Sequence, residues 1–159
     1  PEMTFSLAAG LNWKGIDFSI LLQGAARSSI YLQQDIAWDN FWGNYYEEHI
    51  GRWTPETAAT ATYPRFTKAA TAAHPNYYKS DYWLKDSKYL RLKNIQLGYT
   101  IPRKLLKKFG VRSLRVYANA YNLFTWDNVK KVDPESSNNS NGQFYPQQKV
   151  INFGINLNF

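Results

Sequence analysis

The sequence has no cysteine, two histidines and no long apolar run. Without cysteine the chain can form neither disulfide bonds nor thiolate metal sites, and it has no cysteine nucleophile. No apolar stretch approaches the roughly 18 residues that a transmembrane helix requires. If the chain meets a membrane, it must therefore do so with β-strands, whose alternating pattern gives a weak hydropathy signal.

The first residues already alternate as a strand does, so we do not expect them to be a secretory signal peptide. We therefore expect a mature protein or a fragment. A concentrated basic surface is missing too, although the formal net charge is +7. Lysine and arginine are dispersed apart from one cluster at Arg103, Lys104, Lys107 and Lys108. We expect these cations at turns and strand ends, and we expect no nucleic-acid partner.

Aromatic residues are abundant, at 17% of the chain, with 6 Trp, 12 Tyr and 9 Phe. A composition of this kind suits the aromatic girdles of a membrane β-barrel, a surface on which sugars stack, or the core of a β-sandwich. The composition alone does not decide among these three structures.

The last residues of the chain alternate strictly between apolar and polar side chains. The apolar positions are Ile151, Phe153, Ile155, Leu157 and Phe159, and the polar side holds Asn152, Gly154, Asn156 and Asn158. Successive strand residues point to opposite faces, so this segment is predicted to be a strand with one apolar and one polar face. About ten such residues, tilted, cross the hydrocarbon core of a bilayer.

Similar alternation predicts strands at residues 3–13, 16–26, 88–101, 112–124 and 148–159. Lys14 and Gly15 form a two-residue hairpin turn between the first two strands. The alternation slips at Lys93 and Asn94, which indicates a β-bulge. Pro102 ends the third strand, and one helical turn closed by Gly110 is expected to follow it.

Two long connections, at residues 25–87 and 127–147, alternate with these short turns. Transmembrane barrels show this arrangement, with short periplasmic turns and long extracellular loops. Five strands cannot close a single-chain barrel, which starts at eight. We therefore predict an all-β fold in which residues 1–159 are the C-terminal strands of a larger antiparallel transmembrane barrel, whose other strands precede Pro1.

Several separated motifs closely resemble the C-terminal region of SusC/RagA-type TonB-dependent outer-membrane transporters. The motifs are SKYLRLKNIQLGYTIP at residues 87–102, LRVYANAYNLFT at 114–125, VDPE at 132–135, WTPE at 53–56, YPRF at 63–66 and SDYWLKD at 80–86. The resemblance covers essentially the whole chain. Residues 57–62 depart from it, because they are rich in Ala and Thr where the family often has Asn and Pro.

The resemblance implies a 22-stranded barrel in the outer membrane of a Gram-negative cell. It also implies an N-terminal plug domain, absent from this chain, and a SusD-like lipoprotein that caps the barrel. Such transporters import oligosaccharides or peptides with energy relayed by TonB, and they are not enzymes. The end of the chain further resembles the signal read by the outer-membrane assembly machinery, carried here by Asn152, Gly154, Leu157 and Phe159.

The aromatic side chains of the long connection are the best candidates for contacts with a ligand or a lid protein. These candidates are Trp38, Trp42, Tyr45, Tyr46, Tyr77 and Tyr78. Sugars stack on such rings, and a lid protein would bury them. The same rings could instead pack the connection onto itself or onto the barrel rim, and that alternative stays open.

No catalytic or cofactor-binding constellation emerges. His49 and His74 lack metal-ligand spacing and are expected at the surface. Glu47 and Glu48, or Asp81 and Asp86, could be a glycosidase pair only if about 5–9 Å separated their carboxyl groups, and no pattern predicts that. The alternative function that we consider is that of a soluble secreted β-sandwich that binds carbohydrate. Such a protein would also contain alternating strands and many aromatic residues.

Overall fold

The computed structural model spans residues 1–159 and describes all of them except 42, 69–73, 130–131 and 137–144. The chain forms two compact units. Unit 1 comprises Pro1–Ser28, Lys88–Asn128 and Gln147–Phe159, and unit 2 comprises Ser29–Ser87 and Val129–Pro146. Unit 2 is therefore built from the two long connections between the strands of unit 1.

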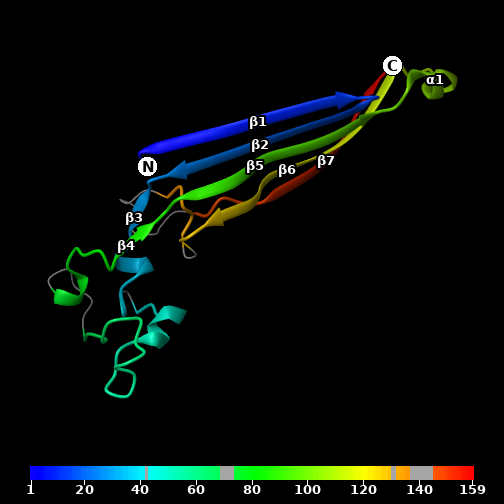
Figure 1. The fold of residues 1–159 in the computed structure, drawn as a ribbon. Coiled ribbons are helices and arrows are strands. Elements are labelled where there is room, and N and C mark those ends of the chain that lie inside the picture. Colours follow the sequence, from blue (N-terminus) through cyan, green and yellow to red (C-terminus); the bar gives the residue numbers. More distant parts are fainter. Residues whose placement is uncertain (42, 69–73, 130–131, 137–144) are drawn as a thin grey trace. The chain divides into compact units, whose positions relative to one another are not determined.

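Unit 1 is a single antiparallel sheet of five strands (Figure 1). Its strands are β1 (Met3–Trp13), β2 (Ile16–Ala26), β5 (Tyr89–Thr100), β6 (Ser113–Asp127) and β7 (Val150–Asn158), in the order β1-β2-β5-β6-β7. The predicted all-β fold and the five predicted strands are present. Strand β6 extends further than predicted, because Thr125, Trp126 and Asp127 continue to pair with β5.

The predicted turn and bulge of the sheet are both present. Lys14 and Gly15 have positive φ values of 47° and 88°, as a two-residue hairpin with the favoured twist requires. On β5, Leu92 pairs with Leu22 and Asn94 pairs with Leu21, so Lys93 is the extra residue of a bulge. The bulge explains why the apolar positions of β5 change parity in mid-strand.

A short helical turn joins β5 to β6, as the sequence predicts. It consists of α1 (Arg103–Leu106) and the 3-10 helix η4 (Lys107–Phe109), and it ends at Gly110 with φ 68°. This left-handed conformation favours glycine. Leu106 is buried, whereas the other residues from 103 to 110 are exposed.

Unit 2 has little regular secondary structure. It contains the paired strands β3 (Ser29–Tyr31) and β4 (Leu84–Asp86) and the 3-10 helices η1 (Gln34–Ile36), η2 (Glu47–Gly51) and η3 (Pro75–Tyr77). Its core is a cluster of buried residues comprising Ile30, Leu32, Ala37, Trp38, Tyr63, Tyr77, Trp83 and Val129. The long connection is thus built around its own aromatic core, and η2, with five residues, is the longest helical segment in its described part.

Candidate functional site

One face of the sheet is apolar across all five strands. Directly paired residues of antiparallel strands lie on the same face, so the register defines it. Two rows illustrate it: Leu11, Phe18, Leu97, Ala118 and Phe153 in one, and Ala9, Ile20, Ile95, Ala120 and Ile151 in the other. Many large side chains on this face are exposed, including Leu7 at 62% and Phe153 at 82%, whereas Leu92 on the central strand β5 is buried. A continuous apolar surface of this kind marks an interaction site.

The opposite face is polar and carries an ion pair between β2 and β6. The Arg115 Nε donates to Asp17 Oδ1 at 2.9 Å, and a second guanidinium nitrogen binds the other carboxylate oxygen. The pair crosses β5 at Gly98, where a Cβ would lie 2.5 Å from Arg115 Nη2 and from Asp17 Oδ1. The missing side chain of Gly98 therefore leaves the room that the ion pair needs.

The aromatic ring of Tyr117 continues this polar network toward β7. Its partner in the register is Gly154, where a Cβ would lie 2.3 Å from Tyr117 Cζ. The Arg115 guanidinium lies 4.8 Å from the centre of the Tyr117 ring. Gly154 thus has a packing role, because the ring of Tyr117 occupies the space that a side chain at this position would take.

The other residues of the predicted assembly signal are divided between the two faces of β7. Asn152 donates a side-chain hydrogen bond to Asn119 Oδ1 at 3.0 Å on the polar face. Leu157 pairs with Leu114 on the apolar face, and Phe159, directly after the strand, is 75% exposed. The structure accounts for the packing of these residues, and their role in assembly stays a prediction.

A fully buried carboxylate, Asp39, organises the polar part of the unit 2 core. Its Oδ1 accepts hydrogen bonds from the hydroxyls of Tyr63, at 3.2 Å, and of Tyr77. Its Oδ2 accepts a hydrogen bond from the backbone N–H of Thr67 at 3.0 Å. Buried charges are tolerated when hydrogen-bonded in this way. The network joins segments that lie up to 38 residues apart in the sequence.

The two tyrosines of this network are strongly perturbed. Burial, reinforced by the negative charge of Asp39, raises the pKa of Tyr63 far above its usual value. Burial and the hydrogen bond to Asp39 raise the pKa of Tyr77 as well. Both hydroxyls therefore remain protonated and able to donate to the carboxylate over the whole physiological pH range.

His49 is buried, and the prediction that it lies at the surface is wrong. The backbone N–H of Tyr46 donates to its Nδ1 at 3.0 Å, so Nε2 carries the proton and donates to the carbonyl of Ala37 at 3.2 Å. Its ring also lies 4.6 Å from that of Tyr63. Its position in the middle of η2, beside an aromatic core, explains the burial. His74, in contrast, is half-buried before η3.

The aromatic residues predicted to contact a ligand or a lid occupy different environments. Trp38 and Tyr77 are buried and lie 4.7 Å apart between ring centroids, which supports the packing alternative for this pair. Tyr46 is half-buried, and its hydroxyl donates to the carbonyl of Asp35. Tyr45 and Tyr78 are exposed at 56% and 57%. Trp42 lies outside the described residues.

Tyr45 belongs to a mixed aromatic and cationic surface. Its ring lies 5.6 Å from that of Phe66, and the guanidinium of Arg52 lies 5.0 Å from the centre of the Phe66 ring. Such rings can stack on a ligand or become buried by a protein partner. Neither Arg52 nor Phe66 was among the predicted contacts, although Phe66 lies within the YPRF motif.

The described residues contain no group of three or more His, Asp or Glu that could hold a metal ion. The carboxylates considered for catalysis, Glu47, Glu48, Asp81 and Asp86, are all exposed. No helix in the described part of the chain has the length and apolar character needed to cross a membrane.

The chain is similar over its whole length to curated receptors. TonB-dependent receptor P26 of Formosa agariphila is 29% identical over 176 residues, which cover 100% of this chain and 17% of the receptor. TonB-dependent receptor P3 of the same organism is 26% identical and covers 100% of the chain and 16% of the receptor. TonB-dependent receptor SusC of Bacteroides thetaiotaomicron is 25% identical, over 99% of the chain and 15% of the receptor.

Solved structures agree with these sequence similarities. The structure of the RagAB peptide transporter matches with a TM-score of 0.72 and 25% identity, over 97% of this chain and 16% of the other. The RagAB peptide importer in its open-open state matches with the same TM-score at 22% identity, over 98% and 17%. No family model matches the chain.

The chain thus spans about one sixth of the length of the relatives that it matches. These relatives are named as receptors and transporters and not as enzymes, as the absence of a catalytic pattern in the sequence led us to expect. The predicted resemblance to SusC/RagA-type TonB-dependent receptors is confirmed over the whole chain.

Proposed function

We propose that this chain is the C-terminal strand segment of a 22-stranded barrel in the outer membrane of a Gram-negative cell. The complete protein would import oligosaccharides or peptides together with a plug domain, a SusD-like lipoprotein and TonB. The proposal rests on the similarity to SusC and to the RagAB transporter, and on the character of the sheet.

The uninterrupted apolar face of the sheet is the observation that carries this proposal. A charged side chain on the lipid face costs about 2–4 kcal/mol near the midplane of the membrane. The paired rows of this face hold no charged residue, whereas Asp17, Arg91 and Arg115 all belong to the polar face. Strands of 9 to 15 residues are long enough to cross the hydrocarbon core.

The two outer strands of the sheet support a larger barrel. Strands β1 and β7 lie at the edges of the five-stranded sheet, so each has backbone groups without a partner strand within unit 1. Open edges are not tolerated in lipid, because water cannot satisfy their hydrogen-bonding groups there. We propose that further strands of the same barrel pair with both edges.

Unit 2 would belong to the extracellular side, as the long loops of such barrels do. We propose that Tyr45 and Tyr78 contact the ligand or the lid, because both rings are exposed. Trp38, Tyr46 and Tyr77 would hold these rings in position from the interior of the unit. Asn152, Gly154, Leu157 and Phe159 would serve as the assembly signal, in addition to their packing in β7.

The rival function, a soluble β-sandwich that binds carbohydrate, needs a second layer over the apolar face. In unit 1 the sheet is a single layer, and many of its large apolar side chains are exposed. Production of residues 1–159 without detergent separates the two functions. The barrel proposal predicts an insoluble or aggregated chain, and a soluble, cooperatively folded monomer would contradict it.

The transport function is tested in the complete protein. A Gram-negative host that produces it should hold it in the outer membrane and should take up oligosaccharide or peptide only when TonB is functional. Uptake that persists without TonB, or a protein found outside the outer membrane, would contradict the proposal. A preference for sugars or for peptides in this assay would identify the class of substrate.

A further inference from the structure

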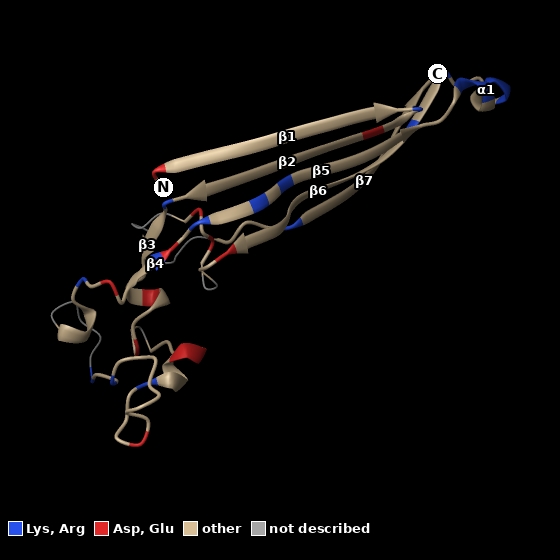
Figure 2. Ribbon diagram, viewed as in Figure 1, with Lys and Arg blue, Asp and Glu red and all other residues tan. Residues whose placement is uncertain are grey.

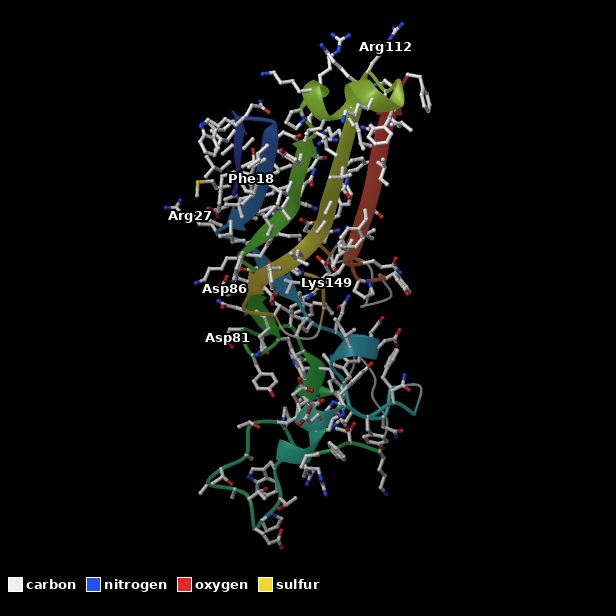
Figure 3. All side chains as sticks on the ribbon, turned by 90° about the vertical axis from the view of Figure 1, so that its right-hand side faces the viewer. Phe18, Arg27, Asp81, Asp86, Arg112 and Lys149 are labelled. Carbon is white, nitrogen blue, oxygen red and sulfur yellow. The ribbon has the colours of Figure 1, made fainter. Side chains whose placement is uncertain are left out.

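The two ends of the sheet in unit 1 carry different charges. The end with the short turns holds Lys14 of the β1–β2 hairpin, and Arg103, Lys104, Lys107, Lys108 and Arg112 of the β5–β6 turn. No Asp or Glu lies between Thr100 and Trp126. Figure 2 shows this turn in blue at one end of the sheet, and Figure 3 labels Arg112 there.

The opposite end of the same sheet has charges of both signs. It holds Glu2, Arg27, Lys88, Asp127 and Lys149, and Arg27 lies 3.8 Å from the carboxylate of Glu2. Among the described residues, in contrast, the cations of the β5–β6 turn form no ion pair. Within the described part of this chain, no carboxylate side chain therefore compensates the charge of this turn.

Exposed apolar side chains accompany these cations on the same turn. Leu105 is 65% exposed and Phe109 is 77% exposed, whereas Leu106 is buried and anchors the turn to the sheet. The turn is further fixed by the Leu105 N–H, which donates to the Pro102 carbonyl at 3.0 Å. Cations interspersed with exposed Leu and Phe are the composition that binds at the headgroup level of an anionic membrane.

The apolar face of the sheet runs up to this turn. Tyr99 and Val116 form its last pair on β5 and β6 before the turn, and Leu157 lies beside Leu114 on the neighbouring strands. If the apolar face lies in the hydrocarbon core, the turn lies at the membrane surface, where phosphate groups are within reach of long basic side chains.

We propose that the β5–β6 turn binds the headgroups of anionic phospholipids in the periplasmic leaflet. This inference rests on the proposed function, because only a membrane-spanning sheet places the turn at that surface. The periplasmic leaflet is favoured over the outer surface because short turns lie on the periplasmic side of such barrels. The turn would fix the depth of the barrel in the membrane by attraction of its cations to lipid phosphates.

The expected effect of the cations is large enough to measure. Each Lys or Arg near an anionic surface strengthens binding by roughly five-fold at moderate salt. Neutralising three of them should therefore reduce the preference for an anionic lipid by about tenfold or more, after allowance for screening. High salt should also reduce the preference for the anionic lipid, because it screens the attraction between the cations and the lipid phosphates.

The test uses the complete receptor, purified in detergent after its assembly in the outer membrane has been verified. It is mixed with equimolar phosphatidylglycerol and phosphatidylethanolamine of the same acyl chains, and the bound lipids are counted by native mass spectrometry. The variant Arg103→Gln/Lys107→Gln/Lys108→Gln removes three cations from the turn. The matched control, Arg27→Gln/Lys88→Gln/Lys149→Gln, removes one arginine and two lysines from the opposite end.

We expect the wild type and the control to prefer phosphatidylglycerol, and the turn variant to lose that preference. The charge-conserving variant Arg103→Lys/Lys107→Arg/Lys108→Arg should keep it, which excludes a general folding defect. Equal loss in the control, or no preference in the wild type, would overturn the proposal. Failure of the wild type to assemble in the outer membrane would contradict the proposed function itself. This failure would be seen before any lipid is added, so it can be distinguished from a failure of the lipid proposal.

Discussion

The sheet of unit 1 and the connections that form unit 2 are both rich in aromatic and aliphatic side chains. The sheet exposes many of these side chains, whereas unit 2 buries them. The sheet directs Leu7, Phe153 and Ile155 outward, where they are 62%, 82% and 69% exposed. Unit 2 buries Trp38 and Trp83 to within 4% of full burial. One part of the chain therefore presents an apolar surface outward, whereas the other encloses its apolar side chains in a core of its own.

The charged residues of the two units also differ in how far they are exposed to solvent. In the sheet, Asp17 and Arg115 pair on the face opposite the apolar surface, and both remain partly exposed. In unit 2, Asp39 is fully buried and is held by Tyr63, Tyr77 and Thr67. From this difference we infer that the stability of the sheet depends on what covers its apolar face, and that the stability of unit 2 depends on a specific internal network.

The largest expected effect comes from a charge placed on the apolar face. Ile20 lies near the middle of β2, so Ile20→Lys should destabilise the assembled barrel by about 2–4 kcal/mol in a bilayer. The neighbouring Ser19 points to the polar face, and Ser19→Lys should have much less effect. Urea unfolding of the complete receptor in lipid vesicles measures both variants, and equal losses would remove the distinction between the faces.

A smaller effect is expected from the network of unit 2. Asp39→Asn should cost roughly 1–3 kcal/mol of local stability, because its amide group presents donors toward Tyr77 or Thr67, which themselves donate. Hydrogen exchange should increase in residues 29–68 and not in the strands of unit 1. The matched variant Tyr78→Ala removes an exposed ring and should leave hydrogen exchange unchanged. Faster exchange in Tyr78→Ala than in Asp39→Asn would contradict the role of Asp39.

The strands could be predicted from the sequence because period-two alternation follows directly from strand geometry. The bulge at Lys93 could be predicted too, since the apolar parity changes there. The network of unit 2 could not be, because Asp39 meets Tyr77 and Thr67 only through packing of segments far apart in the chain. The burial of His49 was missed for the same reason, and the three-residue strands β3 and β4 are too short to show alternation.

Alkaline pH should lower the free energy of unfolding of unit 2 by a moderate amount. The pKa values of Tyr63 and Tyr77 are raised above the usual 10.0, so the unfolded chain loses these protons first as the pH rises. Stability is therefore fully present below pH 10 and declines above it, by up to about 1.4 kcal/mol per pH unit for each tyrosine. Tyr63→Phe should flatten this decline in pH-dependent unfolding of unit 2, and an unchanged slope would contradict the assignment.

A substitution directly after β7 should have the smallest effect on the folded structure. Phe159→Ser removes an exposed apolar ring that follows the strand and should reduce the assembled receptor several-fold, while the strand itself persists. Quantification of the protein in the outer-membrane fraction measures this effect. Asn158→Ser is the neighbouring control, and assembly unaffected by Phe159→Ser would remove this residue from the assembly signal.

The most direct test of the contrast between the two parts is the accessibility of alternate positions along β7. Because the chain has no cysteine, spin labels can be attached in this segment at single cysteines introduced at positions 151, 152, 153, 155 and 156 of the complete receptor, after removal of any cysteine elsewhere. Position 154 is left unlabelled, because a side chain there would collide with Tyr117. In lipid vesicles, labels at Ile151, Phe153 and Ile155 should be accessible to oxygen, and those at Asn152 and Asn156 should not. Accessibility without a period of two, or water-soluble reagents reaching Phe153 and Ile155, would contradict a membrane-facing sheet.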